Sequence, residues 1–293
     1  MKFTVNPEQD RERLDKFLAG QLPDISRSFL QSLCKHDKVM VNGQPQKSGY
    51  KLHWHDTVEV LHDIEAIGQP KDIAIPILFE NDDVIVVNKP SGVLSHALSK
   101  FKDEPSVASF LRQHSKNATQ NIRYGIIHRL DRLTSGVMIC AKNDETVTSL
   151  QRQFANRQVE KEYIAVVSRQ PKHQEAIIDI PLERNPKRPA TFRPGKNGKP
   201  AQTHYQVLSA GTSGALLAVK PKTGRTHQIR VHLQHIQCPI VGDTLYGGKK
   251  ADRLYLHAKS LTLYIPGLPD LKTFSAPVPD EFSNQIGKNI DHE

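Results

Sequence analysis

The stretch HRLDRLTSG, residues 128–136, places one carboxylate, Asp131, between Arg129 and Arg132. Apolar segments typical of strands flank it, and loops held by rigid elements often present reactive groups. Nearby guanidinium groups favour the ionised form of a carboxylate, which can then act as a nucleophile, a base or a metal ligand. A structural ion pair is the alternative, because such pairs also perturb titration.

A second polar cluster lies in KTGRTHQIRVHLQH, residues 222–235. Its apolar positions follow i, i+4 and i+7, which predicts a helix that begins near Thr226 and His227. Free backbone N–H groups and the helix dipole favour an anion at such a start, and Arg225 lies just outside it. The cluster therefore predicts a phosphate seat, with simple helix capping as the alternative.

Two further patterns bear on ligands. The segment 184–199 carries six basic residues and no acidic one, and its prolines and glycines predict a flexible basic arm that contacts phosphates. The histidines could be tested as a metal set, but they lack an H-E-x-x-H motif or Cys/His spacing, so no metal site is expected. They are His227, His232, His235 and His257.

The composition favours a polyanionic partner. The 293 residues include 40 Lys and Arg against 31 Asp and Glu, a net charge of +9. Three scattered cysteines fit a reducing cytoplasm. The charged start lacks a secretory apolar core, and no apolar run is long enough to cross a bilayer. We therefore expect a cytoplasmic protein without a membrane partner.

The elements that must position these residues divide the chain in two. Leu14, Phe17 and Leu18 predict a first helix, Ser26 or Ser28 could cap a second, and Asn42-Gly43 predicts a tight hairpin. A polar, Pro-containing linker should follow. We expect a small domain over 11–62, a linker over 63–75 and a larger domain over 76–285.

The larger domain alternates strands and helices in mixed order. Strands joined by short turns favour a mixed, largely antiparallel sheet flanked by helices, and therefore the α+β class. The predicted helices cover 106–114, 146–157 and the part of 222–235 that follows the Gly224 turn. The predicted strands are DVIVVNKP, YGIIHRL, GVMICAK, KEYIAVV, THYQVLSA and ALLAVKP.

The segment RLDKFLAGQLPDISRSFLQSLCKHDKVMVNGQ resembles the small RNA-binding domain named after ribosomal protein S4. In that family the second helix and the loop before the hairpin face structured RNA. The resemblance implies contacts with RNA for Arg27, Ser28 and Lys35.

Five motifs together resemble the RluA family of RNA pseudouridine synthases, in order and in spacing. They are NKPSG at 88–92, HRLDRLTSG at 128–136, KEY at 161–163, KTGRTHQIRVH at 222–232 and LHA at 256–258. The resemblance covers nearly the whole chain, because members often carry the small RNA-binding domain in front. It implies the pseudouridine synthase fold and a reaction without a cofactor or a required metal.

The resemblance also assigns roles. Asp131 is implied as the essential carboxylate, as nucleophile at ribose or as base at C2′, and Arg230 as its partner. Tyr163 is implied to pack against the uracil and could transfer a proton. Arg129 would stack in the space left by a flipped uridine. We expect Arg225, His227 and Lys89 to contact RNA as well.

The sequence leaves the substrate open. Family members with this N-terminal domain frequently act on large-subunit ribosomal RNA, which we expect here, with tRNA as the alternative. A non-catalytic RNA-binding or assembly factor and a metal-dependent nuclease are rival functions. We expect a monomer.

Overall fold

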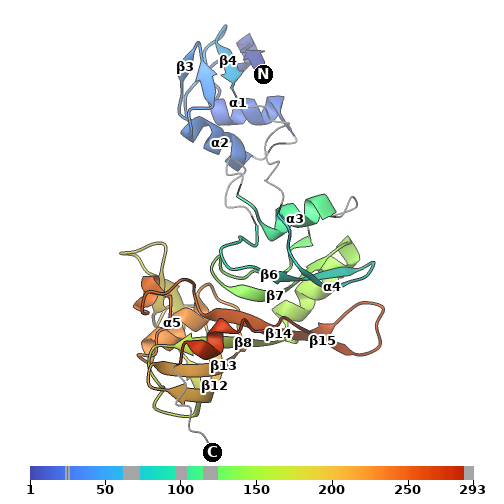
Figure 1. The fold of residues 1–293 in the computed structure, drawn as a ribbon. Coiled ribbons are helices and arrows are strands. Elements are labelled where there is room, and N and C mark those ends of the chain that lie inside the picture. The colour runs from blue at the N-terminus through green and yellow to red at the C-terminus, as the bar shows by residue number, and fades with distance from the viewer. Residues whose placement is uncertain (24, 26, 62–72, 97–103, 115–124, 287–293) are drawn as a thin grey trace, which may run out of the picture. The chain divides into compact units, whose positions relative to one another are not determined.

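A computed structural model describes residues 1–23, 25, 27–61, 73–96, 104–114 and 125–286 (Figure 1). These residues form two compact units. Residues 1–61 belong to the smaller unit, and the described residues from 73 onward belong to the larger one. No helix within the described ranges is long and apolar enough to cross a membrane.

The smaller unit packs two helices against a four-stranded sheet of order β1-β4-β2-β3. The helices are α1 (Leu14–Gln21) and α2 (Arg27–Lys35), and the strands are β1 (Lys2–Thr4), β2 (Val39–Val41), β3 (Gln44–Pro45) and β4 (Thr57–Val60). The predicted helices and hairpin are confirmed. Asn42 and Gly43 both have positive φ, at 50° and 77°, as a tight hairpin turn requires.

Two boundaries in this unit differ from the expectation. Strand β1 pairs with β4, so the unit begins before residue 11. Helix α2 begins at Arg27, which places Ser28 inside its first turn instead of at the N-cap; Ser26 lies outside the described residues. Most of the expected linker also lies outside them, whereas Ile75 is 4% exposed in the core of the larger unit.

The larger unit is built on a mixed sheet with nine described strands. Its order is β5-β6-β7-β14-β8-β13-β12-β9, with β15 beside β14, and only the β14–β7 pair is parallel. The strands are β5 (Ile77–Glu80), β6 (Val84–Lys89), β7 (Ser135–Ala141), β8 (Glu160–Val167), β9 (Glu175–Asp179), β12 (Gln202–Gly211), β13 (Gly214–Pro221), β14 (Leu256–Tyr264) and β15 (Leu271–Ser275). The predicted α+β class and largely antiparallel sheet are confirmed.

Helices cover this sheet. Helix α4 (Asp144–Ala155) packs against β7, and α5 (Gln228–His235) packs against β12 and β13. The other α-helices among the described residues of this unit are α3 (Val107–His114) and α6 (Glu281–Asn284). The sequence predicted α3, α4 and α5, because each carries an apolar stripe at helical spacing.

The strand predicted at YGIIHRL does not form in its described part. Ile126 makes a single bridge to Cys140, and then the ring of His128, instead of a backbone carbonyl, accepts the N–H of Ile139 at 3.1 Å. A side chain that takes the place of a main-chain acceptor ends the ladder. The segment therefore runs as a loop beside β7 and leads into Asp131.

Much of the basic segment 184–199 belongs to a hairpin, whereas its prolines and glycines had predicted an irregular arm. Strand β10 (Leu182–Arg184) pairs with β11 (Phe192–Pro194). Leu182 is buried in a small apolar cluster with Val231 and Tyr246, and Phe192 packs against it. This apolar anchor was hidden by the surrounding charge, and it fixes the segment to the body of the larger unit.

Candidate active site

Asp131 lies in a tight turn immediately before β7. The Thr134 N–H donates to the Asp131 carbonyl at 3.1 Å, which closes the turn. On the other side, the Leu130 N–H donates to Ser95 Oγ at 3.0 Å, and that hydroxyl lies 2.9 Å from the Leu130 carbonyl. The carboxylate is thus presented by a loop whose backbone is held on both sides.

The NKPSG loop braces this turn. Ser91 Oγ donates to the Leu133 carbonyl at 2.7 Å, and the Gly92 N–H donates to the Arg132 carbonyl at 2.9 Å. The Lys89 ammonium donates to the carbonyls of Pro90, Val93 and Arg132 at 3.0, 2.8 and 3.1 Å. Two motifs that are 40 residues apart in the sequence therefore form one rigid platform.

Lys89 is placed differently from the expectation. It is fully buried at the end of β6, and burial lowers its pKa to about 7. An ammonium group that is enclosed by three carbonyls cannot also meet a phosphate in solvent. The expected contact between Lys89 and RNA is contradicted by this burial, and its role is to hold the loop of Asp131.

Gly136 explains the glycine of the HRLDRLTSG motif. Its φ is +114°, and a Cβ there would collide with the backbone of Ala258. Only glycine allows β7 and β14 to approach in this way. The close approach pairs Ala258 with Gly136 and brings the LHA motif beside the turn that carries Asp131.

Arg230 links Asp131 to a second carboxylate. From α5, its Nη1 lies 3.2 Å from Asp131 Oδ2, while Nε and Nη2 donate to the two Asp243 oxygens at 2.7 and 2.8 Å. The Arg230 side chain is 5% exposed, Asp243 is 1% exposed and Asp131 is 18% exposed. Burial alone would lower the pKa of Arg230, but its two carboxylate partners raise it. The guanidinium is held charged and aimed at Asp131.

His227 turns toward this pair and away from the expected phosphate seat. It is the N-cap of α5, with φ of 56°. Its Nε2 lies 3.8 Å from Asp131 Oδ2, and its Nδ1 lies 2.7 Å from the Tyr246 hydroxyl. Arg225 is half-buried, and its Nε donates to the Pro200 carbonyl at 3.1 Å. Of the two, Arg225 retains free guanidinium donors beside the pocket.

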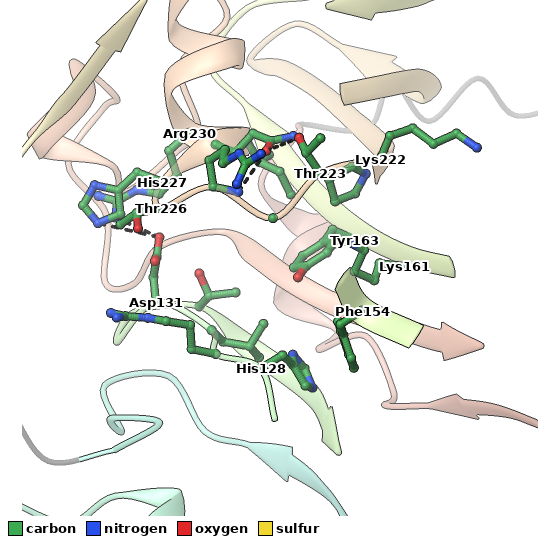
Figure 2. Close-up of a pocket in the computed structure, with 18 of the residues that line it drawn as sticks. His128, Asp131, Phe154, Lys161, Tyr163, Lys222, Thr223, Thr226, His227 and Arg230 are labelled. Atoms are coloured by element: carbon green, nitrogen blue, oxygen red, sulfur yellow. Dashed lines mark hydrogen bonds and ion pairs between the residues drawn. The ribbon is translucent and has the colours of Figure 1, made fainter. Parts of the chain in front are cut away.

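A cavity of about 460 Å³ is lined by Asp131, Arg225, His227 and Arg230 among others. Figure 2 shows the side chains around it. Tyr163 and Lys161 enter it from alternate positions of β8, so they point to the same face of the strand. Burial raises the pKa of Tyr163, and the negative charge of Asp131 raises it further, which keeps the phenol neutral. Burial lowers the pKa of Lys161 to about 8.

An aromatic pair bounds the cavity beside Lys161. The rings of His128 and Phe154 stack at a centroid distance of 4.8 Å. Burial lowers the pKa of His128 to about 3, and Lys161 lowers it further, so the imidazole is neutral. The cavity thus combines flat apolar faces with a few polar groups, which suits a planar heterocycle.

The RNA-binding candidates occupy two places. Arg129 is exposed and lines the cavity in the larger unit. In the smaller unit, Arg27 donates to the buried Asp15 with Arg13 and Gln31, while its side chain stays 51% exposed. Burial would raise the pKa of Asp15, but these donors hold it well below its usual range. Ser28 and Lys35 are exposed on α2.

Several site residues were not found from the sequence: His128, Phe154, Lys161, Asp243 and Tyr246. The last two lie in GDTLYGG, whose only signal is a glycine-flanked turn. The histidines tested as a metal set have separate partners, since His232 bonds to Thr203 and His257 to Ser135. Among the described residues, no group of three or more His, Cys, Asp or Glu side chains could hold a metal ion.

The fold and the site together define a class of RNA-modifying enzyme. The family described as RNA pseudouridylate synthase matches residues 83–235, which include Asp131, Tyr163 and Arg230. The S4 domain matches residues 12–58 of the smaller unit. The chain belongs to the RNA pseudouridine synthases, and within them to the RluA family.

Relatives match nearly the whole chain. An uncharacterized RNA pseudouridine synthase of Bacillus subtilis is 35% identical, over 97% of this chain and 96% of its own. Ribosomal large subunit pseudouridine synthase D of Escherichia coli is 34% identical, over 97% of this chain and 92% of its own. Human RNA pseudouridylate synthase domain containing 1 has a similar structure, with a TM-score of 0.58 and 28% identity over 70% of this chain and 83% of its own.

Proposed function

We propose that this enzyme converts uridine to pseudouridine in structured large-subunit ribosomal RNA, with Asp131 as the essential carboxylate. The observation that carries the proposal is the Asp131–Arg230 pair, at 3.2 Å, on the wall of a cavity that also presents Tyr163. The name of the Escherichia coli relative, ribosomal large subunit pseudouridine synthase D, supports the choice of RNA.

The reaction requires little besides a carboxylate and a shaped cavity. The bond between N1 of uracil and C1′ of ribose breaks, the base rotates, and C5 bonds to C1′. The hydrogen of C5 leaves as a proton and N1 gains one, so there is no net oxidation and no cofactor is needed. Asp131 acts on ribose, either as nucleophile or as base at C2′, and both roles need the charged form that Arg230 favours.

The base is held by the other wall of the cavity. Tyr163 offers an aromatic face for the uracil and a neutral hydroxyl for proton transfer. When the N1–C1′ bond breaks, the electron pair stays on the uracil. Lys161, two positions before Tyr163 on the same face of β8, then supplies a positive charge beside the negatively charged base.

A uridine within folded RNA must leave its stack to reach Asp131, at a cost of about a few kcal/mol. The exposed guanidinium of Arg129 can stack where the base has left, because it is planar and weakly hydrated. Arg27, Ser28 and Lys35 in the smaller unit, with Arg225 in the larger one, contact the RNA backbone. Such contacts position the RNA without reading its sequence.

Tritium release from RNA labelled at C5 of uridine tests the proposal. Wild type and Asp131→Asn are compared on ribosomal RNA and on tRNA, in separate reactions with EDTA, and RNA length is checked on a gel. Release from ribosomal RNA by wild type alone, without shortening, supports the proposal. Tritium release from tRNA alone would mean that the substrate is tRNA and not ribosomal RNA. Shortened RNA would indicate a nuclease. RNA binding without tritium release would indicate a non-catalytic assembly factor.

A further inference from the structure

Tyr246 lies behind the site and has no place in the mechanism described so far. It ends the 3-10 helix η3 (Thr244–Tyr246), which directly follows Asp243, the partner of Arg230. The residue is 8% exposed, so its hydroxyl is removed from solvent and needs partners within the protein.

The phenol contacts both groups that face Asp131. Its hydroxyl lies 2.7 Å from His227 Nδ1, and the two rings meet edge to face with centroids 5.5 Å apart. The Arg230 guanidinium carbon lies 5.0 Å from the centre of the Tyr246 ring, within the range of a cation–π contact. One side chain therefore touches the two neighbours of the essential carboxylate.

One of the two hydrogen bonds at this hydroxyl has a fixed direction, and the direction of the other depends on the tautomer of His227. The Phe192 N–H of strand β11 donates to the Tyr246 hydroxyl at 2.9 Å, because a backbone N–H can only donate. This bond leaves the hydroxyl hydrogen available to donate to His227 Nδ1, which accepts in the Nε2-protonated tautomer. A neutral imidazole with Nδ1 as acceptor carries its hydrogen on Nε2, the atom 3.8 Å from Asp131 Oδ2.

The surroundings of His227 agree with this neutral form. Burial lowers the pKa of the imidazole, and Arg230 and Arg129 also lower it, whereas Asp131 and Asp243 act in the opposite direction. Besides these four charged groups, the ring meets Phe192 edge to face at 5.8 Å. Its orientation is thus set by the Tyr246 hydroxyl and by two aromatic edges.

We propose that Tyr246 is a positioning residue for the reaction: its hydroxyl fixes the Nε2-protonated tautomer of His227, and its ring supports the Arg230 guanidinium, so that both donors face Asp131. The inference rests on the proposed role of Asp131. The Tyr246 hydroxyl also connects the basic hairpin to the site, because it accepts the N–H of Phe192 on β11.

Kinetics with matched variants test this role. Tyr246→Phe removes the hydroxyl and keeps the ring, and it should lower kcat about tenfold with KM for ribosomal RNA unchanged. His227→Asn, which tolerates the positive φ, should have a similar effect, and the double variant should be no slower than the worse single one. Tyr255→Phe is the control, because that buried hydroxyl also has two partners, Asp252 and Gln285, and lies outside the cavity.

Imidazole nitrogen shifts give a readout that is independent of activity. In wild type labelled with ¹⁵N-histidine, His227 should show a protonated Nε2 and an acceptor Nδ1, with its signals assigned through His227→Asn. Tyr246→Phe should remove this preference, and Tyr255→Phe should keep it. An Nδ1-protonated His227 in wild type, a Tyr246→Phe kcat equal to that of Tyr255→Phe, or independent effects in the double variant would overturn the proposal. Full activity of Asp131→Asn would instead refute the proposed function and leave the tautomer result standing.

Discussion

The Asp243 carboxylate accepts two hydrogen bonds from Arg230, from Nε at 2.7 Å and from Nη2 at 2.8 Å. The third guanidinium nitrogen, Nη1, faces Asp131. Because the Asp243–Arg230 pair is almost fully buried, it has little freedom to reorient. This bidentate interaction fixes the plane of the guanidinium before any RNA binds. Asp243 thus determines the direction from which Asp131 meets positive charge.

Asp243→Asn should therefore reduce both stability and turnover. Breaking a buried ion pair costs about 3–5 kcal/mol of the free energy of unfolding, and we expect the lower end because Arg230 keeps Asp131 as a carboxylate partner. Urea denaturation measures this change, and tritium release measures the accompanying fall in kcat. Glu183→Gln is the matched control: it breaks a more exposed pair with Arg193 and should cost less than about 1 kcal/mol. Equal losses in the two variants would contradict the orienting role.

Lys161 should impose a high-pH limit on activity. Its pKa is lowered to about 8 by burial, so the ammonium loses its proton as the pH rises through that value, and the rate should fall with it. Lys161→Met should lower kcat about a hundredfold at pH 7, as removal of one charge-stabilising donor does. Lys161→Arg keeps a positive charge at high pH, so its rate should not decline near pH 8. A pH–rate profile of kcat checks this, with Lys222→Arg at the exposed rim as control; an unchanged decline in Lys161→Arg would assign it to another group.

Lys89 and Arg129 should separate stability from RNA binding. Lys89→Met removes the ammonium donor from three carbonyls, of which that of Arg132 keeps the Gly92 N–H. It should lower the free energy of unfolding by about 1–3 kcal/mol and leave the RNA affinity of the folded protein unchanged. Arg129→Ala changes an exposed side chain and should weaken RNA binding without loss of stability. Urea denaturation and a filter-binding titration at fixed salt measure the two effects. A weaker RNA affinity of folded Lys89→Met would restore the contact expected from the sequence.

Gly136→Ala should lower the stability of the larger unit by more than the backbone strain alone accounts for. A left-handed residue costs about 1–2 kcal/mol when it carries a Cβ, and here the Cβ would also collide with the Ala258 backbone. Gly267→Ala supplies the comparison, because Gly267 has φ of +78° with open space around it. Thermal unfolding of both variants gives the difference. Similar unfolding midpoints for the two variants would mean that β7 and β14 can move apart to accommodate the Cβ without a loss of stability.

The sequence by itself predicted most of the helices and strands that position the site, and it supplied the candidates for the reacting groups. Apolar spacing located α1, α4 and α5 because amphipathic periodicity is a local property that packing preserves. The long motifs singled out Asp131, Tyr163 and Arg230 as candidates through their resemblance to the family. The loop at 125–130 was missed because a side chain, His128, took the place of a backbone acceptor.

The tertiary structure decided the contacts, including the Arg230–Asp131 pair that the family resemblance had implied. Arg230 and Asp131 are 99 positions apart, and whether they touch depends on how α5 packs beside the turn before β7. Burial turned Lys89 from an expected RNA contact into a brace, because burial depends on the whole sheet. Asp243 and Tyr246 carry no local pattern, and their roles arise only where η3 returns to α5. The sequence gives the residue types. The distances between side chains and their exposure to solvent, which set the charge state and orientation of each group, depend on the fold.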